Sequence, residues 1–143
     1  ASSESVDLAA LGLPAAAAYH VVDFWQEEYH RVDGSRLRIA SIAPHGVALF
    51  CVRPVEDQPS WVGDTLHISQ GLAVRDWSVK GKAAVASLDA GHHAHGQAWL
   101  WAPGRPTAVR WRASRLAWDE PHPGVCRVAL SVERQGELQV EWE

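Results

Sequence analysis

The stretch CRVALSVERQGELQVEW, residues 126–142, decides the fold class of this chain. Apolar residues occupy alternate positions in each of its halves, and the halves meet at ArgGlnGly, residues 134–136, a turn sequence that predicts a hairpin. The alternating apolar residues are Val128, Leu130, Val132, Leu138, Val140 and Trp142. Because side chains on a strand point alternately to opposite faces, the pattern predicts antiparallel strands with one buried face and one solvated face.

Further short strands are predicted in the rest of the sequence. They are rich in β-branched and aromatic residues, and turn residues separate them at the spacing typical of a sandwich or barrel. The predicted strands are 19–25, 37–42, 47–52, 65–69, 82–88, 94–101, 107–112, 115–118, 126–133 and 138–142. Sustained helical periodicity does not appear after residue 20. The sequence therefore predicts an all-β protein, an antiparallel β-sandwich of the Greek-key type.

The two ends of the predicted domain differ in character. Residues 1–10 are small and polar and are expected to be a linker or tail, followed by a single domain over residues 11–143. A short helical turn is expected over residues 8–13, before Pro14. Methionine is absent even at position 1, which favours a piece cut from a longer protein.

The segment 47–52 is almost continuously apolar, which is typical of a buried strand. We expect Val47, Leu49 and Cys51 to share one strand face with little solvent exposure. Cys51 and Cys126 both lie in apolar runs, and cysteine is among the most buried residue types. Both are therefore expected to be buried free thiols.

Composition excludes several classes of protein. The 143 residues fit one domain, and 47% hydrophobic with 21% charged residues is a globular balance. A net charge of −4 without a basic stripe argues against a nucleic-acid partner. The sequence has no apolar run of the roughly 20 residues that a membrane-spanning helix needs, so no membrane partner is expected. The absence of a visible export signal favours the cytoplasm.

Eight histidines raise the question of a metal site, and GlyHisHisAlaHisGly holds the densest group, His92, His93 and His95. On a strand, His93 and His95 would face one side and His92 the other, and no common zinc-ligand spacing is present. We therefore expect a polar hairpin loop between the strands 84–88 and 97–101. Any metal binding there is expected to be adventitious, and no cofactor is expected.

The carboxylates do not predict an active site. Glycosidases use two carboxyl groups that flank the bond, whereas Glu27 and Glu28 are adjacent and would point to opposite faces of a strand. Asp23 is the one carboxylate within an apolar strand, and we interpret it as satisfied by backbone N–H groups or an arginine. No catalytic residue is assigned to this chain.

Tryptophan is the outlier of the composition, with eight residues. Exposed indoles can stack on the C–H face of a sugar, whereas buried ones fill a core or an interface. Core or interface is the expected role for most of them. Trp61 and Trp77, which lie beside predicted turns, are the candidates for sugar stacking.

Three segments resemble, in this order, the C-terminal domain of bacterial α-galactosidase-like hydrolases, the family 36 glycoside hydrolases and their relatives. They are LGLPAAAAYHVVDFWQEEY at 11–29, APHGVALFCVRP at 43–54 and WVGDTLHISQG at 61–71. PGRPTAVRW at 103–111 and ELQVEW at 137–142 resemble the last hairpins of that domain. The resemblance covers most of residues 11–143 and depends on the order and spacing of the segments.

Two positions depart from the family pattern. Asp64 follows Gly63 where serine is commoner, and the hairpin 109–118 turns at AlaSer, residues 113–114, in place of AsnGly. The resemblance implies a catalytic (β/α)8 barrel elsewhere in the same polypeptide, because such a barrel takes roughly 250 residues. The barrel's nucleophile and acid map onto no residue here.

The function expected from the resemblance is that of a non-catalytic accessory domain that packs against this barrel. Tyr19, Phe24 and Trp25 are the expected contacts, and strand periodicity would leave one of Phe24 and Trp25 buried and the other available. The alternative is a free-standing carbohydrate-binding module that uses exposed tryptophans. In that alternative the domain binds a carbohydrate and does not pack against a barrel.

Overall fold

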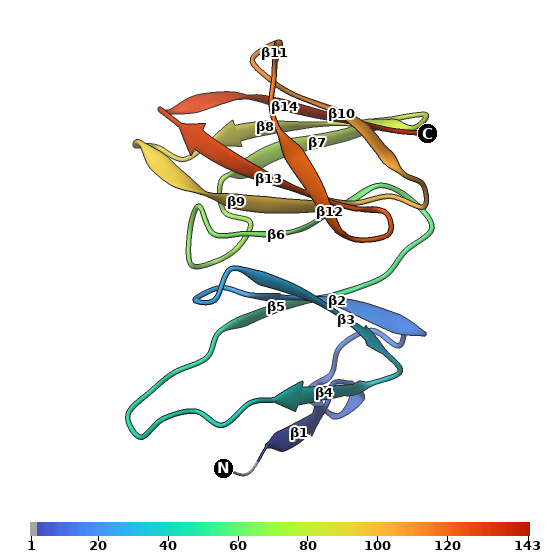
Figure 1. Ribbon diagram of the computed structural model, residues 1–143, viewed down its shortest axis with the longest axis vertical. Coiled ribbons are helices and arrows are strands. Elements are labelled where there is room, and N and C mark those ends of the chain that lie inside the picture. The colour runs from blue at the N-terminus through green and yellow to red at the C-terminus, as the bar shows by residue number, and fades with distance from the viewer. Residues whose placement is uncertain (1–2) are drawn as a thin grey trace. The chain divides into compact units, whose positions relative to one another are not determined.

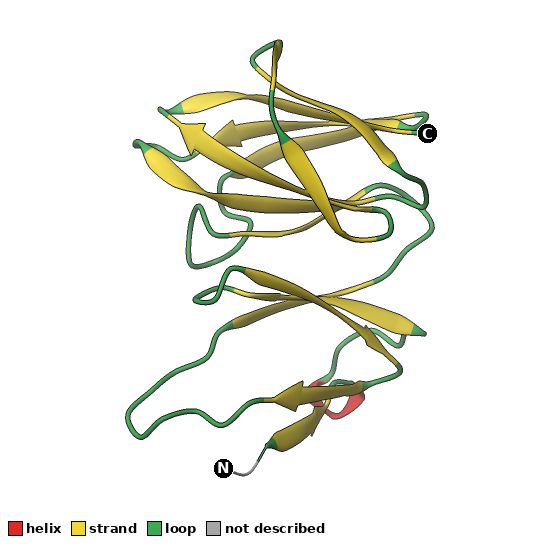
Figure 2. Cartoon of the chain, in the orientation of Figure 1, coloured by secondary structure: helices red, strands yellow, loops and turns green. Residues whose placement is uncertain are grey.

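The chain folds mostly into β-strands joined by turns and loops (Figure 1, Figure 2). A computed structural model describes residues 3–143. Within these residues the paired strands all run antiparallel, and the helical element is one 3₁₀ turn, η1 (Ala9–Leu11). The predicted all-β antiparallel fold is confirmed, and so is the short helical turn before Pro14. No helix in this part of the chain is long and apolar enough to cross a membrane.

The chain divides into two compact units, residues 1–55 and 56–143. The sequence predicts instead a tail over 1–10 and one domain over 11–143. The division has a physical basis, because each unit has an apolar cluster of its own. Residues 4–7 of the predicted tail form a strand, and they pair with residues 36–39.

The first unit contains two small sheets around one core. Its strands are β1 (Glu4–Asp7), β2 (Ala18–Asp23), β3 (Glu28–Asp33), β4 (Arg36–Ile39) and β5 (Phe50–Pro54). One sheet has the order β3-β2-β5 and the other pairs β1 with β4. Leu8, Tyr19, Val21 and Leu37 form the buried cluster of this unit. The apolar positions of β2 and β4 thus face each other across the core.

The sequence predicts a buried strand over residues 47–52, and this prediction is wrong for residues 47–49. Strand β5 begins only at Phe50, Val47 is 73% exposed, and Leu49 and Cys51 are half-buried. The physical reason is the lack of a partner strand, since Phe50 pairs with Asp23, the last residue of β2. Beyond that point Leu49 accepts the backbone N–H of Phe24 at 2.9 Å, and within the loop the N–H of Gly46 donates to the Ala43 carbonyl at 2.8 Å. Residues 40–49 therefore form an irregular loop.

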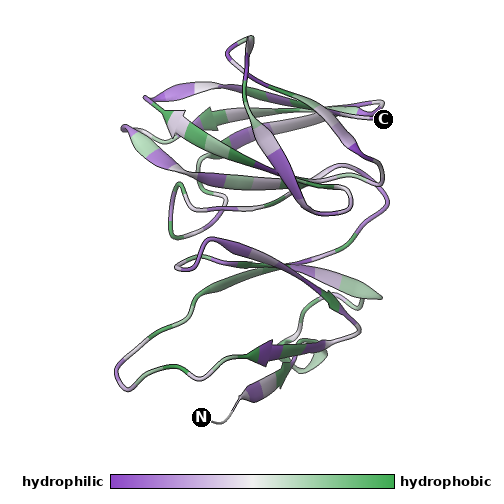
Figure 3. Ribbon diagram, viewed as in Figure 1, coloured by the Kyte–Doolittle hydropathy of each residue, from purple (hydrophilic) through white to green (hydrophobic). Residues whose placement is uncertain are grey.

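The second unit is a β-sandwich. Its strands are β6 (Ser60–Asp64), β7 (Val74–Lys80), β8 (Ala83–Asp89), β9 (Ala94–Trp101), β10 (Pro106–Trp111), β11 (Ser114–Arg115), β12 (Trp118–His122), β13 (Val125–Val132) and β14 (Gln135–Trp142). A five-stranded sheet has the order β11-β10-β14-β8-β7, and a four-stranded sheet has the order β12-β13-β9-β6. Hydropathy alternates along these strands (Figure 3), and the apolar faces of both sheets form one core.

The predicted faces of the last two strands are correct, but their pairing is not. Val128, Leu130 and Val132 are buried, and so are Leu138 and Val140. However, β13 pairs with β12 and β9, whereas β14 pairs with β10 and β8. The turn between β13 and β14 therefore carries the chain from one sheet to the other. The two apolar faces meet across the core instead of lying side by side in one sheet.

The loop with His92, His93 and His95 also connects two strands of different sheets. The sequence predicts a hairpin there, but β8 lies in the five-stranded sheet and β9 in the four-stranded sheet. In contrast, the predicted hairpin turn near residues 113–114 is real, and β10 pairs with β11. Arg112 and Ala113 supply its positive φ angles of 50° and 65°. This is the backbone conformation that AsnGly would adopt more readily.

The predicted strand over residues 65–69 is also wrong. The strand lies earlier, at Ser60–Asp64, in a segment that resembles a turn in sequence. Asp64 is fully buried, and its Oδ1 accepts the backbone N–H of Leu66 at 3.0 Å and of His67 at 3.4 Å. An aspartate that bonds to the backbone two and three residues ahead turns the chain, so the strand ends there.

Candidate functional site

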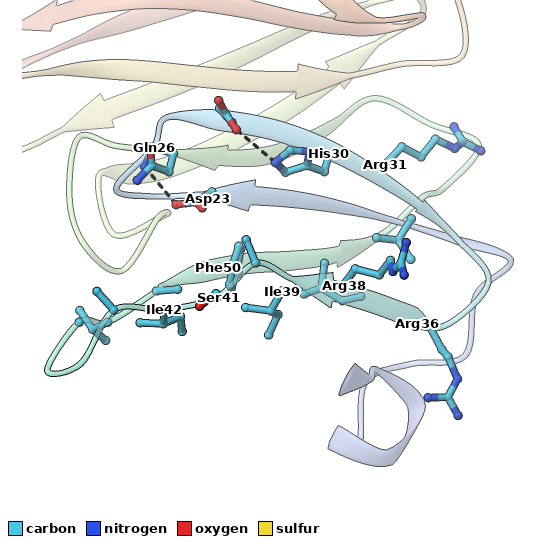
Figure 4. A pocket seen from close by; sticks show the side chains of 18 of the residues that line it. Asp23, Gln26, His30, Arg31, Arg36, Arg38, Ile39, Ser41, Ile42 and Phe50 are labelled. Carbon is cyan, nitrogen blue, oxygen red and sulfur yellow. Dashed lines mark hydrogen bonds and ion pairs between the residues drawn. The ribbon is translucent and has the colours of Figure 1, made fainter. Parts of the chain in front are cut away.

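A groove of about 810 Å³ lies in the first unit (Figure 4). One side is formed by the end of β2, the turn after it and β3, and the other by β4 and the loop 40–49. Among residues 3–143, strand β3 pairs only with β2 and β4 pairs only with β1, so each strand has one edge without a described partner. The loop 40–49, which has no partner strand, supplies part of one wall of the groove.

Charged side chains of both signs line the groove. They are Asp23, Glu28, Asp33, Arg31, Arg36 and Arg38. Arg31 is paired internally with Asp33 at 3.1 Å, and His30 lies 3.5 Å from Glu28. Arg38 has no hydrogen-bond or ion-pair partner described within residues 3–143, so its guanidinium is available to a ligand.

Asp23 is satisfied in the way that the sequence suggests. Its Oδ1 accepts the backbone N–H of Gln26 at 3.1 Å, which closes the turn between β2 and β3. Register places Asp23 directly opposite Glu28, and both carboxylates line the groove. Like charges that are directly opposite in a sheet are destabilising, so this end of the groove is a region of negative potential, in which Glu28 has His30 beside it.

The three aromatic residues predicted to face a partner have different positions. Tyr19 is buried in the core of its own unit, and its hydroxyl donates to the Pro14 carbonyl at 2.6 Å. Phe24 and Trp25 lie in the turn after β2, where strand alternation no longer applies, with their rings edge to face at 4.8 Å. Phe24 is half-buried and Trp25 is 52% exposed. Trp25 is thus the accessible ring of the three.

The two tryptophans predicted to stack on sugar pack instead against the core of the second unit. Trp61 is buried in the sandwich core, and its Nε1 donates to Asp64 Oδ2 at 3.1 Å. Trp77 is half-buried, packs on the same core and meets Trp61 edge to face at 6.4 Å. Trp61 has no open face for a sugar, which corrects the sequence prediction for this residue.

The histidine group does not form a described metal site. The rings of His93 and His95 lie 4.3 Å apart, on one side as predicted, and His93 Nε2 is 3.0 Å from Ser131 Oγ. Among residues 3–143 no three or more His, Cys, Asp or Glu side chains are arranged to hold a metal ion.

Residues 1–52 match the family described as the alpha galactosidase C-terminal beta sandwich domain. The resemblance is confirmed for this segment. The match ends close to the boundary of the first unit at Val55, so the motifs at 61–71 and 103–142 lie outside it. No curated protein matched the chain.

Sequence reasoning did not find the groove of the first unit. Arg31, Arg36 and Arg38 give a weak signal, because one of them precedes the AspGly turn at 33–34 and two follow it. Their common position depends on how β4 leaves that turn to pair with β1, which is a tertiary feature.

The thiol of Cys126 gives a testable consequence of burial in the second unit. Burial, followed by the nearby carboxylates of Asp119 and Glu120, raises the pKa of Cys126 from 9.0 to about 12. In a Cys51→Ser variant, iodoacetamide at pH 8.5 is expected to leave Cys126 unmodified until the protein is unfolded, as peptide mass spectrometry would show. Modification of the native protein at the rate of a free thiol would contradict this expectation.

The same pKa predicts a pH dependence of stability. Between pH 9 and pH 12 the unfolded state loses the Cys126 proton while the folded state keeps it, so the unfolded state binds fewer protons. The contribution of this thiol is therefore constant below pH 9, and stability falls as the pH rises toward 12.

Proposed function

We propose that this chain is a non-catalytic C-terminal accessory domain of an α-galactosidase-like glycoside hydrolase. The observation that carries the proposal is the match of residues 1–52 to the α-galactosidase C-terminal domain. In this proposal the domain packs against a (β/α)8 catalytic barrel of the same polypeptide. A barrel takes at least about 200 residues, more than the chain offers.

Accessible apolar side chains of the first unit support a protein partner. Trp25, Ile42 and Val47 are 52%, 48% and 73% exposed, and all three lie in residues that match the family. Large exposed apolar residues at neighbouring loops are typical of protein interfaces, in which tryptophan is enriched. Trp25 is the proposed principal contact with the barrel, and Phe24 holds its ring in place.

The carbohydrate-binding module that depends on tryptophan stacking has less support. Its candidate Trp61 is buried, and Trp77 is half-buried against the core. Seven of the eight tryptophans are buried or half-buried, which is the environment of core residues. The accessory-domain proposal is therefore preferred.

Hydrolysis of an aryl α-galactoside tests the proposal. The chain alone is expected to show no turnover above the buffer blank, and the full-length polypeptide is expected to hydrolyse the substrate. Turnover by the chain alone that is lost in an Asp23→Asn variant would contradict the non-catalytic assignment.

The packing is tested with Trp25→Ala in the same two proteins. In the isolated chain the exposed Trp25 contributes little, and we expect a change within about 0.5 kcal/mol. In the full-length polypeptide the variant should lose activity on heating at a lower temperature, without a change in KM. Leu72→Ala, which removes an equally exposed side chain of the second unit, is the control. Equal behaviour of both variants in both proteins would contradict the proposed contact.

A further inference from the structure

The groove of the first unit combines features that its proposed packing role does not require. Its volume of about 810 Å³ lies within the range of ligand pockets, roughly 300–1,000 Å³. Figure 4 shows Asp23, Gln26 and His30 on the β2–β3 side, and Arg38 and Ile39 on the β4 side. A ligand between the two sides would meet hydrogen-bond acceptors on one side and donors on the other.

The charges of the lining limit the kind of ligand. Three carboxylates and three arginines line the groove, so the lining carries no large excess of either sign. An anionic ligand would be repelled by Asp23 and Glu28, which oppose each other in register. A cationic ligand would be repelled by the arginines of β4. The balance favours a neutral ligand with hydroxyl groups that both donate and accept hydrogen bonds.

The apolar part of the lining limits the ligand further. Phe50, Ile39 and Ile42 also line the groove, on the side of β4 and the loop that follows it. A purely polar ligand would leave these side chains exposed, whereas a pyranose ring presents an apolar C–H face beside its hydroxyls. This amphipathic pattern is that of a saccharide.

An added strand from a protein partner is the competing occupant, and the edge of β3 argues against it. Glu28, Arg31 and Asp33 are charged residues on this edge strand, and charged side chains are a common protection of strand edges against pairing. The same side chains that discourage strand addition are suitable for planar, often bidentate hydrogen bonds to neighbouring hydroxyls.

We propose that the groove between β3 and β4 binds a neutral saccharide, with Arg38 as a donor and Asp23 as an acceptor. Arg38 has no partner among the described residues, and Asp23 uses one carboxylate oxygen for the Gln26 N–H. The site does not include Trp25, the proposed principal contact with the barrel, although Ile42 and Val47 belong to both surfaces. It would give the accessory domain a binding function of its own.

Isothermal titration of the whole chain tests the proposal, with raffinose and methyl α-galactoside as neutral probes and with galacturonate and glucosamine as charged probes. Saturable binding of a neutral probe is expected, and Arg38→Ala and Asp23→Asn are each expected to weaken it about tenfold or more, as for the loss of a charged hydrogen-bond partner. Arg115→Ala, an exposed arginine of β11, is the matched control and should leave binding unchanged. Far-UV circular dichroism of each variant verifies the fold.

Several outcomes would overturn the proposal. They are a flat titration with both neutral probes, equal or tighter binding of a charged probe, and binding that Arg38→Ala and Asp23→Asn do not weaken. If sugars do not bind and these variants instead lower the heat tolerance of the full-length enzyme, the groove is a protein contact. That result would leave the accessory-domain proposal intact and reject the saccharide site.

Discussion

Replacing Leu130 by alanine is expected to lower the free energy of unfolding of the second unit by about 2–5 kcal/mol. Leu130 is 4% exposed and lies on β13, which is flanked by β12 and β9 within its sheet. Its side chain belongs to the cluster that both sheets of the sandwich share. Alanine would leave a cavity between two sheets whose strands are fixed by backbone hydrogen bonds, so little relaxation can fill it.

Urea denaturation followed by tryptophan fluorescence measures this effect. Seven of the eight tryptophans lie in residues 56–143, so the signal reports mainly on the second unit. Leu72→Ala removes the same atoms from a side chain that is 54% exposed, and it should change stability by no more than about 0.5 kcal/mol. A cost below about 1 kcal/mol for Leu130→Ala would show that β13 is not central to the core.

Gly124→Ala is expected to destabilise the second unit by about 2–5 kcal/mol, from two separate causes. Gly124 has a φ of 84°, a conformation that costs an ordinary residue about 1–2 kcal/mol. In addition, a Cβ there would lie 2.3 Å from Cζ3 of Trp101 and 2.5 Å from the carbonyl oxygen of Ala102. Relief of this overlap would shift a buried indole, at a cost of about 1–3 kcal/mol.

Gly81→Ala separates the two causes. Gly81 also has a positive φ, of 62°, but a Cβ there would meet no atom within 4 Å. It should therefore show only the backbone cost of about 1–2 kcal/mol. If the two variants prove equally stable in the same urea titration, the close contact between Gly124 and Trp101 is not a constraint on the fold.

The groove was beyond the reach of sequence reasoning for an identifiable reason. The charges of Asp23, Glu28 and the β4 arginines are visible in the sequence, but their common location is not. It depends on β4 leaving the turn at residue 34 to pair with β1, in a segment that resembles a tail. It also depends on the loop 40–49, whose apolar sequence predicts a strand that has no neighbour to pair with.

The sequence alone determined which face of each long strand is buried. Val128, Leu130 and Val132 lie in the core as their alternation predicts, because side-chain direction on a strand follows from local geometry. Trp142 and Val109 follow the same rule. The family resemblance of the first segment was likewise contained in the order of its residues, and the match over residues 1–52 confirms it.

Only the tertiary structure decided which sheet each strand joins and where the units divide. Alternation is identical for a strand that pairs with the strand before it and for one that crosses to the opposite sheet. The sequence therefore predicts a hairpin of β13 and β14, which the structure does not contain. Pairing depends on hydrogen bonds between distant segments, such as β14 with β8 and β2 with β5. These partners also fix where a strand ends, which is why Val47 is exposed while Val128 is buried.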